Sequence, residues 1–202
     1  MTAQISDTII YQGRNFTLAG INGEGLFDPD QIGLEVFMIS TGCYAGFYCT
    51  YTIRDDRLLL TKLTVGFNGE DRAIAERGEG PIHFGVHPQR DPRPDSHYYP
   101  WSNWYYGELA HPVEFTGTLS IGTDFIQEMY EHMGYHPDYK YREVYELVFQ
   151  SGRLESVQDC SEKMAKFRDV VGANHPLAPP NRTDKEGIRE WIRRTFDRSS
   201  HG

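Results

Sequence analysis

Three pairs of short β-prone runs, each pair joined by a two-residue turn, constrain the fold of this chain more than any other feature. The turns are Gln12-Gly13, Asp55-Asp56 and Ser151-Gly152. A two-residue loop between β-branched and aromatic runs is typical of a β-hairpin, because it reverses the chain and leaves both arms in register. The sequence therefore predicts three hairpins, over residues 8–20, 46–65 and 141–158.

The run from 46 to 54 has the clearest strand pattern. Phe47, Cys49, Tyr51 and Ile53 alternate with more polar residues, and alternate side chains of a strand lie on opposite faces. A similar alternation covers 113–121, and another short strand is expected at 81–87. These patterns predict a mostly antiparallel β-sheet, built from hairpins and curled into a barrel or sandwich, with helices added to give an α+β fold.

One short helix is expected inside the β-rich part. Asp124 followed three residues later by Gln127 resembles a capping box, and this predicts a helix ending near Met133. His132 would then lie at the helix C-terminus, where a histidine interacts favourably with the helix dipole. Gly134 would provide the left-handed residue that ends the helix.

Two more helices are expected at the C-terminus, the first over 159–172 and the second from 183. Both open with a capping signature and carry an apolar stripe at helical spacing. We therefore divide the chain into a β-rich core domain, residues 1–158, and a helical extension, residues 159–202, packed on the same domain.

Composition excludes some classes of partner. The formal net charge is −9 and the pI is about 5.3, so the chain as a whole repels polyanions, and we expect neither a nucleic acid nor a membrane as partner. The N-terminus has no basic start before an apolar stretch, which favours a cytoplasmic protein. The three cysteines have no CxxC spacing and do not suggest a disulfide framework, and Cys49, on an apolar strand face, is expected to be a small buried thiol.

The most distinctive local feature is an aromatic stretch within a long connection, 66–104. Two Trp and four Tyr lie between residues 98 and 106. These rings could line a ligand pocket or anchor a protein interface, where Trp and Tyr are enriched. They could equally hold a long loop against the core, which is the simpler interpretation. The candidate partner-binding residues are His97, Tyr99, Trp101, Trp104 and Tyr106.

Catalytic candidates are weaker. His83 and His87 are four residues apart, and His132 and Cys43 are further polar groups with known catalytic uses. Zinc sites need three or four ligands, and no companion ligands stand at a recognisable spacing, so we expect no metal and no other cofactor. Cys43 could be exposed next to Gly42, but a reactive thiol needs a neighbouring base or helix N-terminus. Neither GxSxG nor a phosphate-binding glycine pattern is present.

Two segments resemble a group of small uncharacterised bacterial proteins. STGCYAGFYCTYTIRDDRLLLTKL (40–63) is similar to their Ser/Thr-Gly-Cys-aromatic strand entry. The segment 115–154 resembles their Thr-Gly strand, His-Met-Gly-Tyr segment and closing hairpin. The resemblance covers about a third of the chain and implies no activity, cofactor or catalytic residue. It makes an immunity- or accessory-type role as a protein-binding partner thinkable, by analogy only.

These observations lead to two hypotheses about function. The first is a non-catalytic binding protein that holds a protein or small-molecule ligand with the 88–106 loop and neighbouring acidic surface. The alternative is a hydrolase, with or without metal assistance, that uses His83, His87, His97 and His132 with Cys43 or carboxylate partners. The alternative requires at least three of these groups to converge in one pocket. The oligomeric state cannot be inferred from the sequence.

Overall fold

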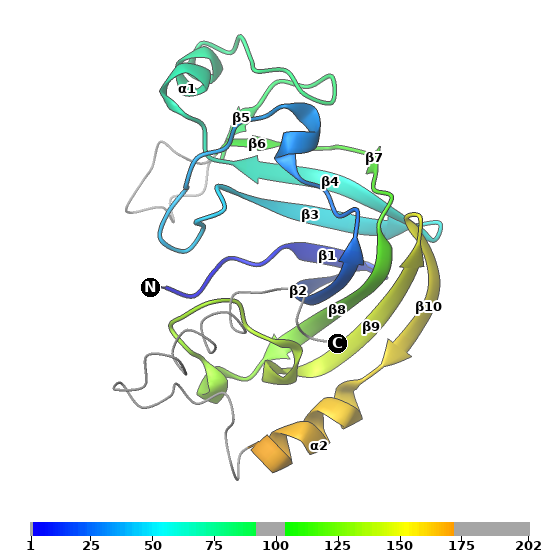
Figure 1. Ribbon diagram of the computed structural model, residues 1–202. Helices are drawn as coiled ribbons and strands as arrows, with labels where there is room; N and C mark the ends of the chain where they lie inside the picture. The colour runs from blue at the N-terminus through cyan, green and yellow to red at the C-terminus, as the bar shows by residue number, and fades with distance from the viewer. Residues whose placement is uncertain (1, 92–103, 172–202) are drawn as a thin grey trace.

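Seven strands close into a barrel in the computed structural model, which describes residues 2–91 and 104–171 (Figure 1). The barrel strands are β1 (Thr8–Tyr11), β2 (Arg14–Glu24), β3 (Phe47–Arg54), β4 (Arg57–Val65), β8 (Thr116–Phe125), β9 (Tyr141–Gln150) and β10 (Arg153–Asp159). Their order is β4-β3-β1-β2-β8-β9-β10, and β10 returns to β4 where Arg153 pairs with Arg57. The expectation of a β-rich barrel or sandwich with helices is confirmed in this coarse form.

All three predicted hairpins are present, as β1–β2, β3–β4 and β9–β10. Both residues of each turn have positive φ, from 45° at Ser151 to 74° at Gly13. This is the backbone of the turn type that matches the twist of a hairpin. Almost every pairing is antiparallel, as expected. The exception is β1, which runs parallel to β3.

Four elements follow β4 in the chain before β8 begins. They are α1 (Gly69–Glu76), β5 (Gln89–Arg90), β6 (Trp104–Tyr106) and β7 (His111–Pro112), while η1 (Pro29–Ile32) lies between β2 and β3 in the sequence. Both β6 and β7 pair with β4. The strand predicted at 81–87 is wrong, because His83 and Val86 instead form an isolated bridge within a tight turn. The sequence reading also missed α1, whose N-cap Asn68 accepts hydrogen bonds from Glu70 and Asp71.

The prediction of a helix from Asp124 to Met133 is also wrong. Strand β8 runs to Phe125, which pairs with Tyr141 of β9, and only the short 3-10 turn η2 (Gln127–Met129) follows. Asp124 has a φ of 57° and its carboxylate accepts from Arg142 (3.1 Å) rather than capping a helix. Pairing with β9 therefore overrides the local capping signal. A second 3-10 turn, η3 (Asp138–Lys140), leads into β9.

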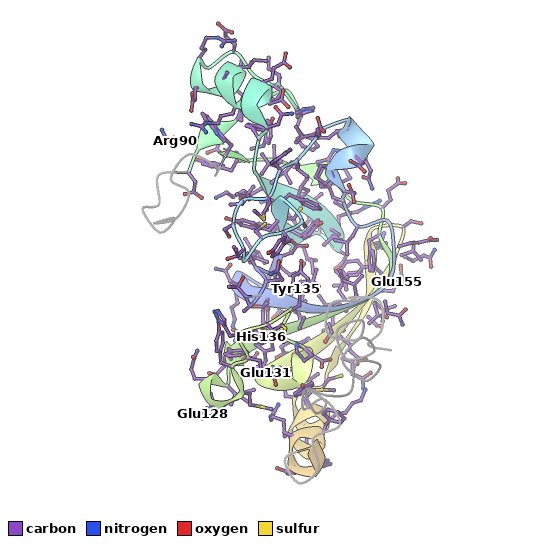
Figure 2. All side chains as sticks on the ribbon, turned by 60° about the vertical axis from the view of Figure 1, so that its left-hand side comes forward. Arg90, Glu128, Glu131, Tyr135, His136 and Glu155 are labelled. Atoms are coloured by element: carbon purple, nitrogen blue, oxygen red, sulfur yellow. The ribbon has the colours of Figure 1, made fainter. Side chains whose placement is uncertain are left out.

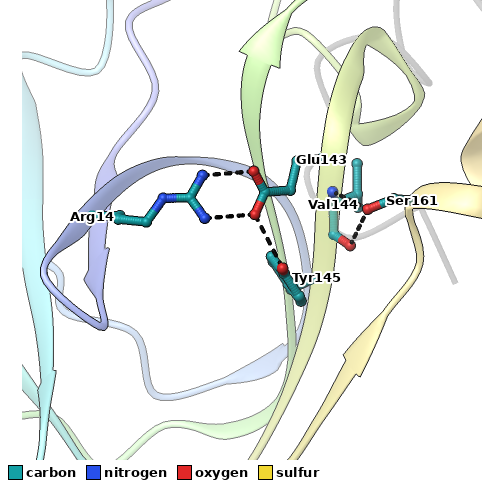
Figure 3. A network of polar contacts seen from close by, with 5 residues as sticks. All are labelled: Arg14, Glu143, Val144, Tyr145 and Ser161. Carbon is teal, nitrogen blue, oxygen red and sulfur yellow. Dashed lines mark hydrogen bonds and ion pairs between the residues drawn. The ribbon is translucent and has the colours of Figure 1, made fainter.

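The first C-terminal helix is present as α2 (Ser161–Val171), and the second, expected from 183, lies outside the described residues. Ser161 attaches α2 to the barrel: its Oγ accepts from the Val144 N–H (3.0 Å) and donates to the Val144 carbonyl (3.4 Å), as Figure 3 shows. The same view shows Arg14 donating twice to Glu143, which also accepts from Tyr145. Among the described residues, no helix is both long and apolar enough to cross a membrane.

We expect Ser161→Ala to lower the free energy of unfolding by about 1–2 kcal/mol, because the part-buried Val144 N–H then loses its acceptor. Urea unfolding measures the change. Ser156→Ala, at an exposed position of the adjoining strand β10, is the matched control and should stay within about 0.5 kcal/mol of the parent. Equal effects at both positions would contradict this role for Ser161.

The barrel interior is packed with apolar side chains. Tyr51, Tyr106, Phe115, Phe149 and Leu119 are among its fully buried residues, which agrees with the size of a barrel whose interior side chains just fill. A second, smaller cluster lies between β9, η3 and α2, around Tyr139, Val144 and Met164. The described interior is therefore filled by the protein's own side chains.

Two glycines face each other across the pairing of β2 with β8. Gly23 has a φ of 149° and its partner Gly117 a φ of 141°. A Cβ on Gly117 would meet the backbone oxygen of Asn22, and one on Gly23 would meet that of Thr116. The two backbones approach more closely here than side chains permit, which is how glycine allows a sheet to bend into a barrel.

Candidate binding surface

Two segments that are distant in sequence are joined by hydrogen bonds beside the start of β3. The Ile5 N–H donates to the Gly42 carbonyl (2.7 Å), the Tyr44 N–H donates to the Gln4 side chain (3.2 Å), and the Thr2 hydroxyl donates to the Thr41 carbonyl. The loop 36–46 lies at the left of the view in Figure 1, near the N-terminus. These hydrogen bonds thus join residues 2–5 to residues 41–44 of that loop.

Exposed apolar side chains gather on these two segments. Phe37 and Tyr44 are each 58% exposed, and Ile5 and Met38 are each 42% exposed. We call these four residues the apolar rim. Isolated exposed apolar residues are ordinary, so what distinguishes these four is their position on two segments that hydrogen bonds join.

The backbone beneath the apolar rim is held tightly. The Phe37 N–H donates to the Gly66 carbonyl (2.7 Å), the Gly66 N–H donates to the Gly46 carbonyl (2.8 Å), and the Ile39 N–H donates to the Cys43 carbonyl (3.2 Å). Because the segment is anchored to β3 and β4, its exposed side chains start from a defined position. A preorganised surface loses less entropy when it binds.

Cys43 lies under the apolar rim and not on it. The expectation that its thiol could be exposed is wrong: Cys43 is buried, and its Sγ lies 3.5 Å from the Phe47 carbonyl. The tight turn from Ser40 to Cys43 points the thiol inward. Cys49 is buried, as expected for a small apolar-like thiol, and so is Cys160.

The candidate catalytic histidines lie in different parts of the fold. His83 follows α1 and packs edge-on against Tyr106, with ring centroids 5.6 Å apart, while His87 precedes β5. Burial lowers the pKa of His83, and the Asp71 carboxylate opposes this shift. His132 lies on the segment between β8 and β9, where its Nδ1 is 3.0 Å from the Tyr130 hydroxyl. Figure 1 shows that segment well away from α1, below the barrel.

The described residues contain no group of three or more His, Cys, Asp and Glu side chains that could hold a metal ion. His97 lies outside the described residues. The segment that carries His132 lies away from α1, while His83 and His87 follow that helix and Cys43 is buried. The convergence that the hydrolase hypothesis requires is therefore not seen in the described part of the chain.

The aromatic candidates divide into two sets. His97, Tyr99 and Trp101 lie outside the described residues. Trp104 and Tyr106 belong to the buried core, and the Tyr106 hydroxyl donates to the Pro81 carbonyl (2.8 Å). Substituting Trp104 would therefore disturb the core, so that residue is unsuitable as a probe of binding.

Sequence reasoning missed a buried polar cluster on the segment between β8 and β9. Lys140 is only 2% exposed and pairs with Glu131 (3.0 Å). Burial lowers the pKa of Lys140, while the hydrogen bond to Glu131 opposes the shift. Figure 2 places Glu131 beside His136, whose two ring nitrogens are buried without a hydrogen-bond partner. Burial first, and then the charge of Lys140, lowers the pKa of His136 to about 4.

A surface pocket of about 560 Å³ lies where η1 faces β7, and its lining includes Phe27, Gln31, His111 and Glu114. The His111 ring packs against Phe84, with centroids 4.9 Å apart. No residue of the apolar rim contributes to this pocket. It is a shallow feature with few converging polar groups, and it identifies no ligand.

No family model matches the sequence, and neither a curated protein nor a solved structure is significantly similar to it.

Proposed function

We propose that this chain is a non-catalytic binding protein that docks on a protein partner through the apolar rim. The single observation that carries the proposal is the gathering of Ile5, Phe37, Met38 and Tyr44 at 42–58% exposure on two joined, anchored segments. Burying such side chains contributes roughly 25 cal/mol per Å² of apolar area. Aromatic residues of this kind are frequent anchors of interfaces.

Charge favours a protein over a polyanion as the partner. The net charge of −9 opposes nucleic acids and anionic membranes. It suits a partner with a basic or neutral surface, which electrostatic attraction would bring in faster. The cytoplasmic location and the immunity- or accessory-type role stay predictions from the sequence and its resemblance.

The test is a comparison of three versions of the full chain as affinity baits in an extract of the cells that produce it. The double variant Phe37→Ser/Tyr44→Ser removes the two most exposed rim side chains. Ile82→Ser is the matched control, because Ile82 is 55% exposed but lies after α1, away from the rim. We expect the parent and the control to retain the same protein and the rim variant to lose it at least about tenfold, equivalent to 1.4 kcal/mol.

Circular dichroism should show that both variants melt like the parent, since neither removes a buried group. The proposal is wrong if the rim variant retains the partner as well as the control does. It is also wrong if the parent retains nothing beyond what the rim variant retains. The hydrolase alternative has no specific observation in its favour among the described residues.

A further inference from the structure

Barrel closure is incomplete at β10. Its pairing with β4 is limited to the end of the two strands, where Arg153 pairs with Arg57 and the Leu154 N–H donates to the Asp56 carbonyl (2.8 Å). Beyond Leu154, β10 keeps β9 as its partner on one side only. On the other side, its backbone groups from 155 to 159 have no partner among the residues that the structure describes. Figure 1 shows β10 as the outermost strand at the right of the barrel.

The side chains of this part of β10 are exposed to solvent, in addition to its unpaired backbone edge. Residues 155–159 are all exposed. Val157 shows that the inner face is open at this strand. It pairs with Leu147, which is fully buried, but Val157 itself is 39% exposed. Its side chain lies on the inner face of the sheet, where no further barrel strand covers it. An added strand would thus gain backbone hydrogen bonds and an apolar contact together.

Charge defines what can bind here. Glu155 and Asp159 stand two residues to either side of Val157. Neither has an ion-pair partner among the described residues, although the Asp159 carboxylate accepts from the Ser161 N–H (2.9 Å). The nearby cations Lys163 and Lys166 are already paired, with Glu146 and Glu162. Figure 2 shows Glu155 at the right-hand boundary of the molecule. The open edge therefore presents two carboxylates around one valine.

A second copy of the chain is a poor occupant. Antiparallel pairing of two β10 strands about Val157 would place Glu155 of each copy opposite Asp159 of the other. Like charges directly opposite each other destabilise a strand pair. A β-bulge also interrupts the pairing of β10 with β9 between Leu154 and Ser156, and bulges and charges are the devices that hinder edge-to-edge association of identical chains.

We propose that the free edge of β10 binds an extended segment of a protein partner in which basic residues flank an apolar one. The segment adds as a strand beside residues 155–159, its apolar side chain covers Val157, and its lysines or arginines face Glu155 and Asp159. This surface is separate from the apolar rim, and the inference does not depend on the function proposed above.

The probe is a short capped peptide in which two lysines flank a central valine, with a matched peptide carrying two glutamates instead. Backbone amide shifts and amide hydrogen exchange of the full chain are followed during titration. We expect the basic peptide to shift and protect amides of residues 155–159, and added salt to weaken it. The acidic peptide should bind at least about tenfold more weakly.

Two variants and one control complete the test. Val157→Lys and Glu155→Lys should each weaken the basic peptide about tenfold. Val148→Lys introduces the same charge on the neighbouring strand β9, at a residue with nearly the same exposure (38% against 39%), and should bind like the parent. The proposal is overturned if the peptide shifts amides elsewhere, if both peptides bind equally, or if Val148→Lys weakens binding as much as Val157→Lys. Dimerisation of the parent through β10, seen by sedimentation, would also overturn it.

Discussion

Gly117→Ala is expected to lower the free energy of unfolding by about 2–6 kcal/mol, a large share of the roughly 5–15 kcal/mol that keeps a domain folded. Gly117 has a φ of 141°, a region that other residues rarely adopt, and this strain costs about 1–3 kcal/mol. The added Cβ would also meet the backbone oxygen of Asn22 and the backbone of Gly23. Backbone cannot rotate away as a side chain can, so β2 and β8 have to separate, at about 1–3 kcal/mol more.

Two controls separate the causes. Gly13→Ala has a positive φ of 74° but nothing within 4 Å of the added Cβ, so it measures strain alone, about 1–2 kcal/mol. Gly69→Ala has neither constraint and opens α1, so it should be neutral or slightly stabilising. Chemical denaturation of the three variants ranks them. If Gly117→Ala and Gly13→Ala lower the free energy of unfolding equally, the close approach of the two backbones does not contribute to the effect.

Lowering the pH from about 6.5 to 4 is expected to destabilise the fold through His136. Its pKa is lowered to about 4 by burial first and by the charge of Lys140 second, while Glu131 acts in the opposite direction. The rings of Phe125 and Tyr130 pack against it and offer a cation little solvation. Between these pH values the unfolded chain binds a proton that the folded chain does not. Stability is therefore full above pH 6.5 and falls progressively towards pH 4.

The free energy of unfolding should fall by about 1–3 kcal/mol. This is less than the full pKa shift of His136 would give, because that residue is only half-buried. His136→Phe should remove this part of the pH dependence. At pH 7 it should cost little, because the ring nitrogens have no hydrogen-bond partner to lose. His132→Phe, which removes an exposed histidine of the same segment, should keep the slope of the parent. Urea unfolding at several pH values measures both, and an unchanged slope in His136→Phe would contradict the assignment.

The hairpins could be predicted because their signals are local. The Gln12-Gly13, Asp55-Asp56 and Ser151-Gly152 turns adopt positive φ within a few residues of the strands they join. The capping signature at Asp124 is equally local, but it led to the wrong prediction of a helix. Phe125 pairs with Tyr141, so β8 continues past Asp124. Long-range pairing outweighs a cap of about 1 kcal/mol. For α1, the signal was present in Asn68 and Asp71 but lay in a stretch poor in apolar residues.

The candidate surfaces could not be predicted, because they depend on distant contacts. Ile5 and Tyr44 become neighbours only when the N-terminal segment pairs with the loop 36–46. The burial of Lys140 contradicts the usual behaviour of lysine and follows from the packing of η3 between β8, β9 and α2. The incomplete contact of β10 with β4 arises only after the whole barrel is assembled.

The contact between β4 and β10 also affects how the chain can fold while it is being synthesised. Strands β4 and β10 meet at Arg57 and Arg153, almost a hundred residues apart. At about 5–20 residues per second, roughly 5–20 s pass between the synthesis of these two positions. Throughout that interval β10 is not yet there to pair with β4. Because β6 and β7 are made before β10 and pair with the same strand, the order of synthesis itself can shield most of β4 from aggregation until the barrel closes.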